Sequence, residues 1–227
     1  MLIVAAARGG SRSRVNNAAA RETHRARRDK MNIGKGINCN LAVFCSGFGS
    51  NFQAILDAVR KRKIGAAIAL MVCDNPKAYA LVRARRSNIP IVLISPKLFK
   101  TRESYERIVI RILKSQKVDL VVLAGFMRIF SPYFIRAHRN RILNIHPSLL
   151  PNFKGAHAIR DAFKAGVKKT GVTVHLVTKD VDTGPILLQK KVKISRNDTL
   201  KTLEKKIHCI EHEIYPPAIQ RFIQKLT

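Results

Sequence analysis

The sequence predicts an α/β protein built on a doubly wound, mainly parallel sheet. From residue 40 onward, five short segments rich in Val, Ile and Leu alternate with four stretches of helical character. Strands that are apolar throughout are typical of a parallel sheet whose two faces are both covered by helices. Ligands bind to such sheets beyond the carboxyl ends of the strands. Functional residues are therefore expected directly after the strands.

Each expected element has a place in this alternation. The strands are 41–45, 68–73, 91–94, 120–124 and 142–145, and the helices are 51–62, 78–86, 102–114 and 132–138. After His146 the pattern changes to a proline-bounded loop (147–154), a helix (158–165), two strands (172–177 and 186–194) and a closing helix from Leu200. No repeat or linker interrupts these elements. Residues 39–227 are therefore expected to form a single domain with a C-terminal strand and helix extension.

Residues 1–38 differ from the rest of the chain. They contain nine Lys or Arg against two acidic residues, with short runs of Ala, Ser and Gly and no periodic apolar pattern. We expect a disordered basic leader. Its composition suits an organelle transit peptide, and equally a misplaced start codon with Met31 as the true first residue. The expected location is therefore the cytoplasm, or an organelle if the leader is a transit peptide.

The composition limits the classes of partner. The chain has 43 Lys and Arg against 14 Asp and Glu, a formal charge of +29. Such a surface attracts anions, although a basic proteome would give the same number. No aromatic residues are interleaved with the basic run 60–63, so nucleic acid is not expected as a partner. The longest apolar runs are too short to span a membrane.

Cysteine and histidine usage argues against a metal site. The four cysteines, at 39, 45, 73 and 209, include no CxxC pair, which favours reduced thiols in a cytosol-like compartment. No metal is expected, because His157, His175, His208 and His212 lack the spacing of zinc ligands.

Two loops follow predicted strands and carry glycines. In the first, Ser46-Gly47-Phe48-Gly49-Ser50-Asn51, the free amide groups at a helix start would attract a monophosphate. The third glycine of a dinucleotide fingerprint and the lysine of an ATP-binding loop are both missing, which disfavours NAD and ATP. A tight capped turn is the alternative. The second loop, Gly125–Phe130, should face the same crevice with Arg128.

The segment Asn144-Ile145-His146 carries the clearest chemical signal. A strand with a period of two places the Asn144 amide and the His146 imidazole on one face. An amide donor beside a group that transfers protons near pH 7 suits an acyl carbon that passes through a tetrahedral oxyanion. Asp182, thirty-six positions after His146, is the candidate carboxylate that would favour the cationic imidazole. Taken singly, His146 fits a structural histidine, and Asp182 a turn residue before Gly184-Pro185.

Four segments together resemble the phosphoribosylglycinamide formyltransferase family, and the resemblance spans Asn40 to the C-terminus. The segments are Ser-Gly-Phe-Gly-Ser-Asn-Phe-Gln-Ala-Ile (46–55), Leu-Ala-Gly-Phe-Met-Arg-Ile (123–129), Leu-Asn-Ile-His-Pro-Ser-Leu-Leu-Pro (143–151) and Gly-Val-Thr-Val-His-Leu-Val (171–177). The resemblance implies the formyltransferase fold, which is Rossmann-like in its N-terminal half. It also implies transfer of a formyl group from the co-substrate 10-formyltetrahydrofolate to the amine of N1-(5-phospho-D-ribosyl)glycinamide, in de novo purine (IMP) biosynthesis.

The family's pattern also implies roles for individual residues. Asn144, His146 and Asp182 would be catalytic. Gly49, Ser50 and Asn51 would hold the substrate phosphate, and Glu211 the ribose hydroxyls. The folate site would be lined by Arg102, Met127, Arg128, Ile129, Phe130 and Asn144. The substrate amine would attack the formyl carbon directly, without a covalent enzyme intermediate. The expected partners are these small molecules, and the protein would be a monomer or a homodimer.

Three alternatives stay open. A formyltetrahydrofolate deformylase would share much of the site, but it carries an N-terminal regulatory domain that a 38-residue leader cannot supply. A methionyl-tRNA formyltransferase would explain the basic charge, but only 45 residues follow Asp182, too few for its tRNA-binding domain. A non-enzymatic RNA-binding protein would leave the site residues unexplained.

Overall fold

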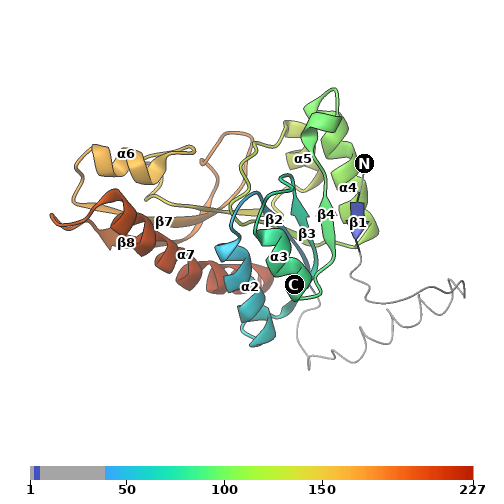
Figure 1. Cartoon of the computed structure of the whole chain (residues 1–227), viewed down its shortest axis with the longest axis horizontal. Helices are drawn as coiled ribbons and strands as arrows, with labels where there is room; N and C mark the ends of the chain where they lie inside the picture. The colour runs from blue at the N-terminus through green and yellow to red at the C-terminus, as the bar shows by residue number, and fades with distance from the viewer. Residues whose placement is uncertain (1–2, 6–38, 227) are drawn as a thin grey trace, which may run out of the picture.

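The computed structural model describes residues 3–5 and 39–226, which form an eight-stranded sheet with helices packed on it (Figure 1). Five parallel strands occupy its middle, in the order β4-β3-β2-β5-β6. They are β2 (Cys39–Cys45), β3 (Ala66–Cys73), β4 (Ile91–Leu93), β5 (Leu120–Leu123) and β6 (Ile142–His146). All five predicted strands are therefore present, and the doubly wound, mainly parallel sheet is confirmed.

Three further strands are antiparallel. β7 (Lys169–Leu176) pairs with β6, and β8 (Ile186–Lys193) pairs with β7. At the other edge β1 (Ile3–Ala5) pairs with β4. The sequence did not predict β1, because three residues are too few to show a pattern and they lie in the segment assigned to the leader. Apart from these three, the residues of the predicted leader lie outside the described part of the chain.

Three of the described helices begin after a residue whose side chain accepts a hydrogen bond from a free amide group of the first turn. The described helices are α2 (Ser50–Arg60), α3 (Ala80–Arg86), α4 (Arg102–Ser115), α5 (Pro132–Ala137), α6 (Ala158–Lys164) and α7 (Leu200–Ile223), with a short 3₁₀ turn η1 at Pro96–Leu98. Thr101 and Thr199 each form a capping box with the residue three positions later. The prediction that α2 continues to residue 62 was wrong, because Arg62 has a left-handed φ of 56° and ends the helix.

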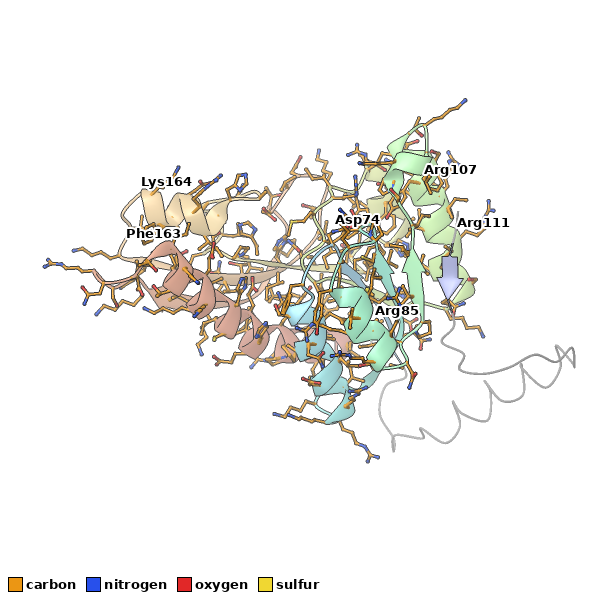
Figure 2. All side chains as sticks on the ribbon, in the orientation of Figure 1. Asp74, Arg85, Arg107, Arg111, Phe163 and Lys164 are labelled. Atoms are coloured by element: carbon orange, nitrogen blue, oxygen red, sulfur yellow. The ribbon has the colours of Figure 1, made fainter. Side chains whose placement is uncertain are left out.

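The basic residues lie mostly on the outer surface. Arg85, Arg107, Arg111 and Lys164 are exposed and project from the outer faces of α3, α4 and α6 (Figure 2). Their positions leave the faces that pack on the sheet apolar. None of the helices in the described residues is long and apolar enough to cross a membrane.

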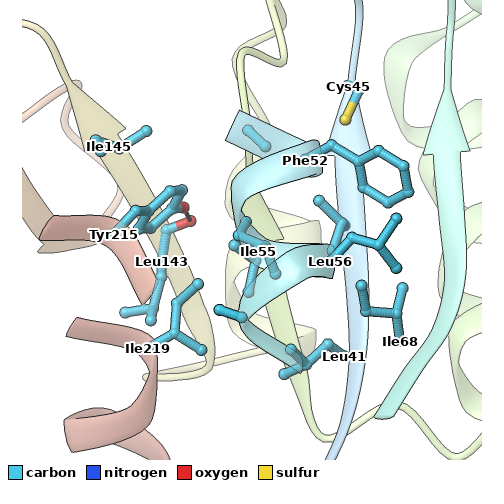
Figure 3. Packing of buried hydrophobic residues seen from close by; sticks show 14 of the residues in the cluster. Leu41, Cys45, Phe52, Ile55, Leu56, Ile68, Leu143, Ile145, Tyr215 and Ile219 are labelled. Carbon is cyan, nitrogen blue, oxygen red and sulfur yellow. Dashed lines mark hydrogen bonds between the residues drawn. The ribbon is translucent and has the colours of Figure 1, made fainter. Parts of the chain in front are cut away.

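β2 lies at the centre of the fold and is buried on both of its faces. Leu41, Val43 and Cys45 belong to the apolar cluster formed with α2, α3 and α7, where Phe52, Ile55 and Ile219 are fully buried (Figure 3). Ala42 and Phe44 belong to the second cluster, formed with α4 and α5. Complete burial of a side chain the size of Leu or Phe contributes about 1.5–3 kcal/mol before entropy is counted.

The chain reverses its winding direction at β2. From β2 the sheet grows through β3 and β4 on one side, and through β5 and β6 on the other. The loops after β2 and β5 therefore leave neighbouring strands at the same edge, and the amide of Ser46 donates to the carbonyl of Gly125 at 3.1 Å. A crevice at such a switch point is the usual ligand site of doubly wound sheets.

Candidate functional site

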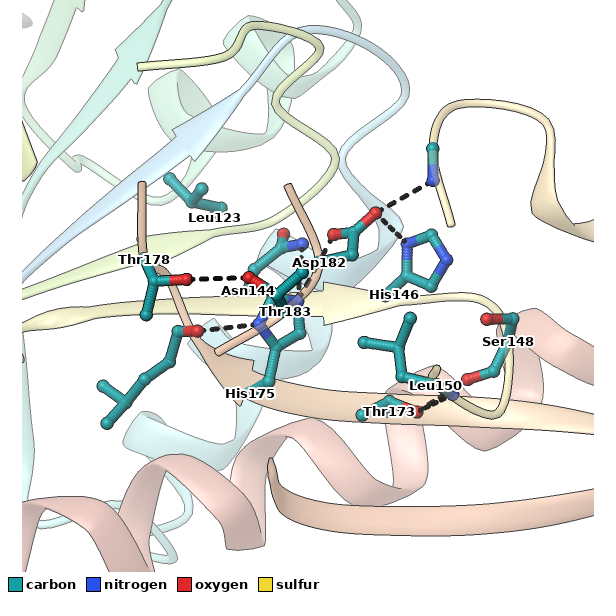
Figure 4. A network of polar contacts seen from close by, with 12 residues as sticks. Leu123, Asn144, His146, Ser148, Leu150, Thr173, His175, Thr178, Asp182 and Thr183 are labelled. Atoms are coloured by element: carbon teal, nitrogen blue, oxygen red, sulfur yellow. Dashed lines mark hydrogen bonds and ion pairs between the residues drawn. The ribbon is translucent and has the colours of Figure 1, made fainter. Parts of the chain in front are cut away.

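Asn144, His146 and Asp182 meet at the carboxyl end of β6. Nδ1 of His146 lies 3.3 Å from Oδ2 of Asp182, and both side chains are buried (Figure 4). Asn144 precedes His146 by two positions on the same strand, so both side chains lie on one face of the sheet. The three residues that the sequence singled out are therefore brought together, although 38 positions separate the first from the last.

Both nitrogens of His146 face acceptors. Nε2 lies 2.8 Å from the carbonyl oxygen of Phe153, and Nδ1 faces the carboxylate of Asp182. Only a ring that carries a proton on each nitrogen can donate to both of these groups. The surroundings therefore suit an imidazolium cation.

Asp182 is held in the turn between β7 and β8 by its backbone and by its contacts. The φ of Asp182 is 52°, which is left-handed. Two positions later, a Cβ at Gly184 would lie 1.8 Å from the carbonyl oxygen of Leu176. Only glycine can therefore occupy position 184. Burial acts to raise the pKa of Asp182, but the hydrogen bonds from His175 and the Gly155 amide and the nearby imidazoles outweigh it and lower this pKa. The carboxylate thus stays ionised.

His175, for which the sequence predicted no role, lies inside this cluster. His175 lies opposite Asn144 in the β6–β7 register, and its Nε2 is 3.4 Å from Oδ1 of Asp182 and 3.3 Å from Nδ2 of Asn144. Nδ1 of His175 contacts the carbonyl of Leu176 at 2.8 Å. The alternation of Val172 and Val174 with Thr173 and His175 was the available signal, because it places the two polar residues on one face.

The loop after β6 is fixed by Thr173 of β7. The Thr173 hydroxyl donates to the carbonyl of Ser148 at 2.7 Å and accepts from the amide of Leu150 at 3.1 Å. These bonds fold the loop back toward the site, where the Phe153 carbonyl meets His146 and the Gly155 amide donates to Asp182 at 2.9 Å. The loop therefore contributes polar groups that fix both the ring and the carboxylate.

The glycine loop after β2 places the start of α2 at the sheet edge. Gly49 has a φ of 74°, and a Cβ there would lie 2.7 Å from the Cβ of Ala80, so the turn requires glycine. The amide groups of Ser50 and Asn51 belong to the first turn of α2, where the positive end of the helix dipole favours anions.

Asn51 and Glu211 meet behind this loop. Nδ2 of Asn51 donates to Oε2 of Glu211 at 2.9 Å, and both residues are buried. His208, one turn earlier on α7, contacts the same carboxylate oxygen at 3.0 Å. The hydrogen bond with Glu211 raises the pKa of His208, against the opposing effect of partial burial.

The loop after β5 exposes apolar side chains beside a cation. Met127 is 75% exposed and Ile129 is 61% exposed, and Arg102 contacts the Ile129 carbonyl at 3.4 Å. The side chain of Phe130 is instead buried among Phe44, Phe126 and Phe134. Any contact of Phe130 with a ligand would therefore have to come from its backbone.

No group of three or more His, Cys, Asp or Glu side chains in the described residues is arranged to hold a metal ion.

Residues 39–219 match the formyl transferase family. This chain belongs to that family. This chain is 43% identical over 182 residues to a phosphoribosylglycinamide formyltransferase of Bacillus subtilis (strain 168). The matched region covers 80% of this chain and 93% of the relative. The chain is 42% identical over 180 residues to the human trifunctional purine biosynthetic protein adenosine-3, but covers only 18% of that longer protein.

Solved structures agree with the fold of this formyl transferase. The phosphoribosylglycinamide formyltransferase from Bacillus halodurans superposes with a TM-score of 0.81 at 42% identity, covering 83% of this chain and 97% of that one. A glycinamide ribonucleotide transformylase from Geobacillus kaustophilus gives a TM-score of 0.80 at 44% identity, and the superposition covers 82% of this chain and 98% of that one. The predicted formyltransferase fold is thereby confirmed.

Proposed function

We propose that this formyl transferase moves a formyl group from 10-formyltetrahydrofolate to the amine of N1-(5-phospho-D-ribosyl)glycinamide, a step of de novo purine biosynthesis. The observation that carries the proposal is the contact of the Asp182 carboxylate with the His146 imidazole, beside Asn144. Relatives named phosphoribosylglycinamide formyltransferase in Bacillus subtilis and Escherichia coli match over 93% and 86% of their lengths.

The oxyanion is the species that the site must stabilise. The formyl donor supplies an acyl carbon bonded to nitrogen, and attack by the substrate amine places negative charge on the formyl oxygen. In our proposal the Asn144 amide donates to this oxygen, and the imidazolium of His146 donates as well. Nδ1 of His146 faces Asp182, so the N–H at Nε2 is the one that would donate to the oxyanion. In doing so, Nε2 would give up its contact with the carbonyl oxygen of Phe153.

Asp182 keeps the ring oriented and charged while this happens. Its lowered pKa keeps the carboxylate negative at neutral pH, which favours the protonated imidazole. The attacking nitrogen loses a proton and the departing nitrogen gains one, and we propose that this transfer runs through water. No side chain forms a covalent bond with the substrate.

The two glycine-containing loops would bind the two substrates. We assign the phosphate to the first turn of α2, at Gly49, Ser50 and Asn51, and the ribose hydroxyls to Glu211, whose carboxylate can accept from them. For the folate we assign Met127 and Ile129, which offer exposed apolar surface to its rings, and Arg102, whose cation suits its carboxylates. The fit of side-chain chemistry to each ligand supports these assignments.

We also infer that residues 39–227 form a single catalytic domain, to whose sheet Ile3–Ala5 of the basic leader (1–38) adds the edge strand β1, and that its compartment is the cytosol. The free thiols of Cys39, Cys45, Cys73 and Cys209 support a reducing environment. We expect a monomer or a homodimer.

The test is an assay with both substrates and with each one omitted. We expect deformylated folate to form only when the amine acceptor is present. Equal turnover without the acceptor would indicate a deformylase instead. Absence of turnover with the ribonucleotide, in a protein that is folded by circular dichroism, would contradict the proposal.

A further inference from the structure

We propose that Asp74 is a positioning residue that holds the β5–α5 loop (residues 125–131) in the shape needed to bind the formyl donor. This inference rests on the proposed function for the identity of the ligand. No role for Asp74 was predicted from the sequence. Asp74 lies directly after β3, in the region of the sheet edge where the two site loops meet (Figure 2).

The contact itself is short, and it is shielded from water on the Asp74 side. Oδ2 of Asp74 lies 2.6 Å from Nε of Arg128, and the side chain of Asp74 is only 7% exposed, against 43% for Arg128. Solvated surface ion pairs contribute little free energy, because water and salt screen them. A carboxylate that is mostly out of water has few other ways to satisfy its charge, so this pair constrains Arg128 more strongly than an exposed pair would.

Asp74 is also committed to this contact by its surroundings. Its other oxygen, Oδ1, is buried and has no hydrogen-bond partner among the described residues. Burial raises the pKa of the nearby Tyr105, and the charge of Asp74 raises it further. Arg128 is the cation in ion-pair contact with Asp74, so loss of Arg128 leaves the shielded carboxylate without its ionic partner.

The ion pair fixes the middle of the loop, whereas other contacts fix its two ends. The Met127 amide donates to the hydroxyl of Ser46 at 3.0 Å, near the start of the loop. At its end, the Ser131 amide donates to the buried carboxylate of Glu106 at 2.7 Å. Arg128 lies between the exposed side chains of Met127 and Ile129. Release of Arg128 should therefore loosen the presentation of these two side chains without unfolding the loop.

This arrangement separates the effect of Asp74 from that of the catalytic cluster. The loop faces the assigned folate subsite, whereas the ribonucleotide subsite lies at α2 and α7. Ordering a loop before binding lowers the entropic cost of binding. We expect Asp74→Asn to raise KM for 10-formyltetrahydrofolate by about tenfold, the factor that corresponds to loss of one charge-assisted hydrogen bond. KM for the ribonucleotide should stay within about twofold, and kcat should fall less than KM rises.

The experiment combines kinetics with hydrogen exchange of the full-length protein. In ligand-free protein, the peptide that covers residues 125–131 should exchange faster in Asp74→Asn than in the wild type, while peptides from β6 and α7 should not change. Asp161→Asn is the matched control, because Asp161 is exposed on α6. Arg128→Met should reproduce both effects, and the double variant Asp74→Asn/Arg128→Met should add little to either single variant.

The outcomes are distinguishable. Unchanged exchange of the loop and an unchanged KM for the folate in Asp74→Asn would overturn the positioning role. If Asp74→Asn does not fold, Arg128→Met, which alters the more exposed partner, decides in its place. If the wild-type protein transfers no formyl group, the proposed function fails, and the exchange result alone still decides whether Asp74 orders the loop.

Discussion

The carboxylate of Asp182 lies between two imidazoles, with His146 at 3.3 Å from one oxygen and His175 at 3.4 Å from the other. The two rings project from adjacent antiparallel strands, β6 and β7. Asn144 contacts the second ring, so the amide, both imidazoles and the carboxylate form one connected network. A change at any member should therefore affect the others.

Asp182→Asn removes the charge from the centre of this network while it preserves the size of the side chain. We expect kcat to fall by about a hundredfold to ten-thousandfold, because the amide no longer favours the cationic imidazole. KM for either substrate should change much less. The measurement is steady-state kinetics of formyl transfer, with Asp180→Asn as the control, since Asp180 is exposed two positions earlier. Full activity of Asp182→Asn would exclude the assigned role.

His146→Ala and Asn144→Ala each remove one proposed donor to the oxyanion. Loss of one such donor typically costs about a hundredfold to a thousandfold in kcat. We expect this loss in each variant, with the far-ultraviolet circular dichroism unchanged. His157→Ala is the matched control, because His157 is exposed just before α6. Near-normal turnover of purified His146→Ala would falsify our mechanism.

His175→Ala tests the residue that the sequence analysis missed. Since His175 contacts both Asp182 and Asn144 without a proposed place at the reacting oxygen, we expect a smaller loss, about tenfold in kcat. His175→Gln retains an amide donor and should recover part of the rate. If both variants lose as much as His146→Ala, His175 acts on the reacting atoms themselves and not through Asp182 and Asn144.

How much of this site could be predicted depends on which interactions are local. The shared face of Asn144 and His146 follows from the period of one strand, and the apolar strands follow from burial on both faces. The place of His175 depends on how β7 pairs with β6, and such a register is a long-range property. For the same reason the Asp74–Arg128 pair, which joins residues 54 positions apart, could not be seen in the sequence.

The glycine-containing loops also combine features that are local in sequence with features that depend on the fold. Glycine at 49 could be understood from its place between a strand and a helix, but the close approach of Ala80 that makes it necessary needed the fold. The resemblance to the family implied a place for Phe130 in the folate site together with its neighbours. Only the packing of the aromatic rings shows that its side chain belongs to the core. The strand β1 had no local signal at all.

The contact between His208 and Glu211 should make stability depend on pH. The pKa of His208 is raised in the folded state, so the contact stabilises the protein fully below the unfolded pKa of 6.5, and this contribution is lost as pH rises through the folded value. Because the His208 side chain is half exposed, we expect less than about 1 kcal/mol. The measurement is the difference in Tm between wild type and His208→Gln from pH 5.5 to 8.5. The wild type should gain relative to the variant toward acid pH, and a difference that grows toward alkaline pH would show that the pair does not form.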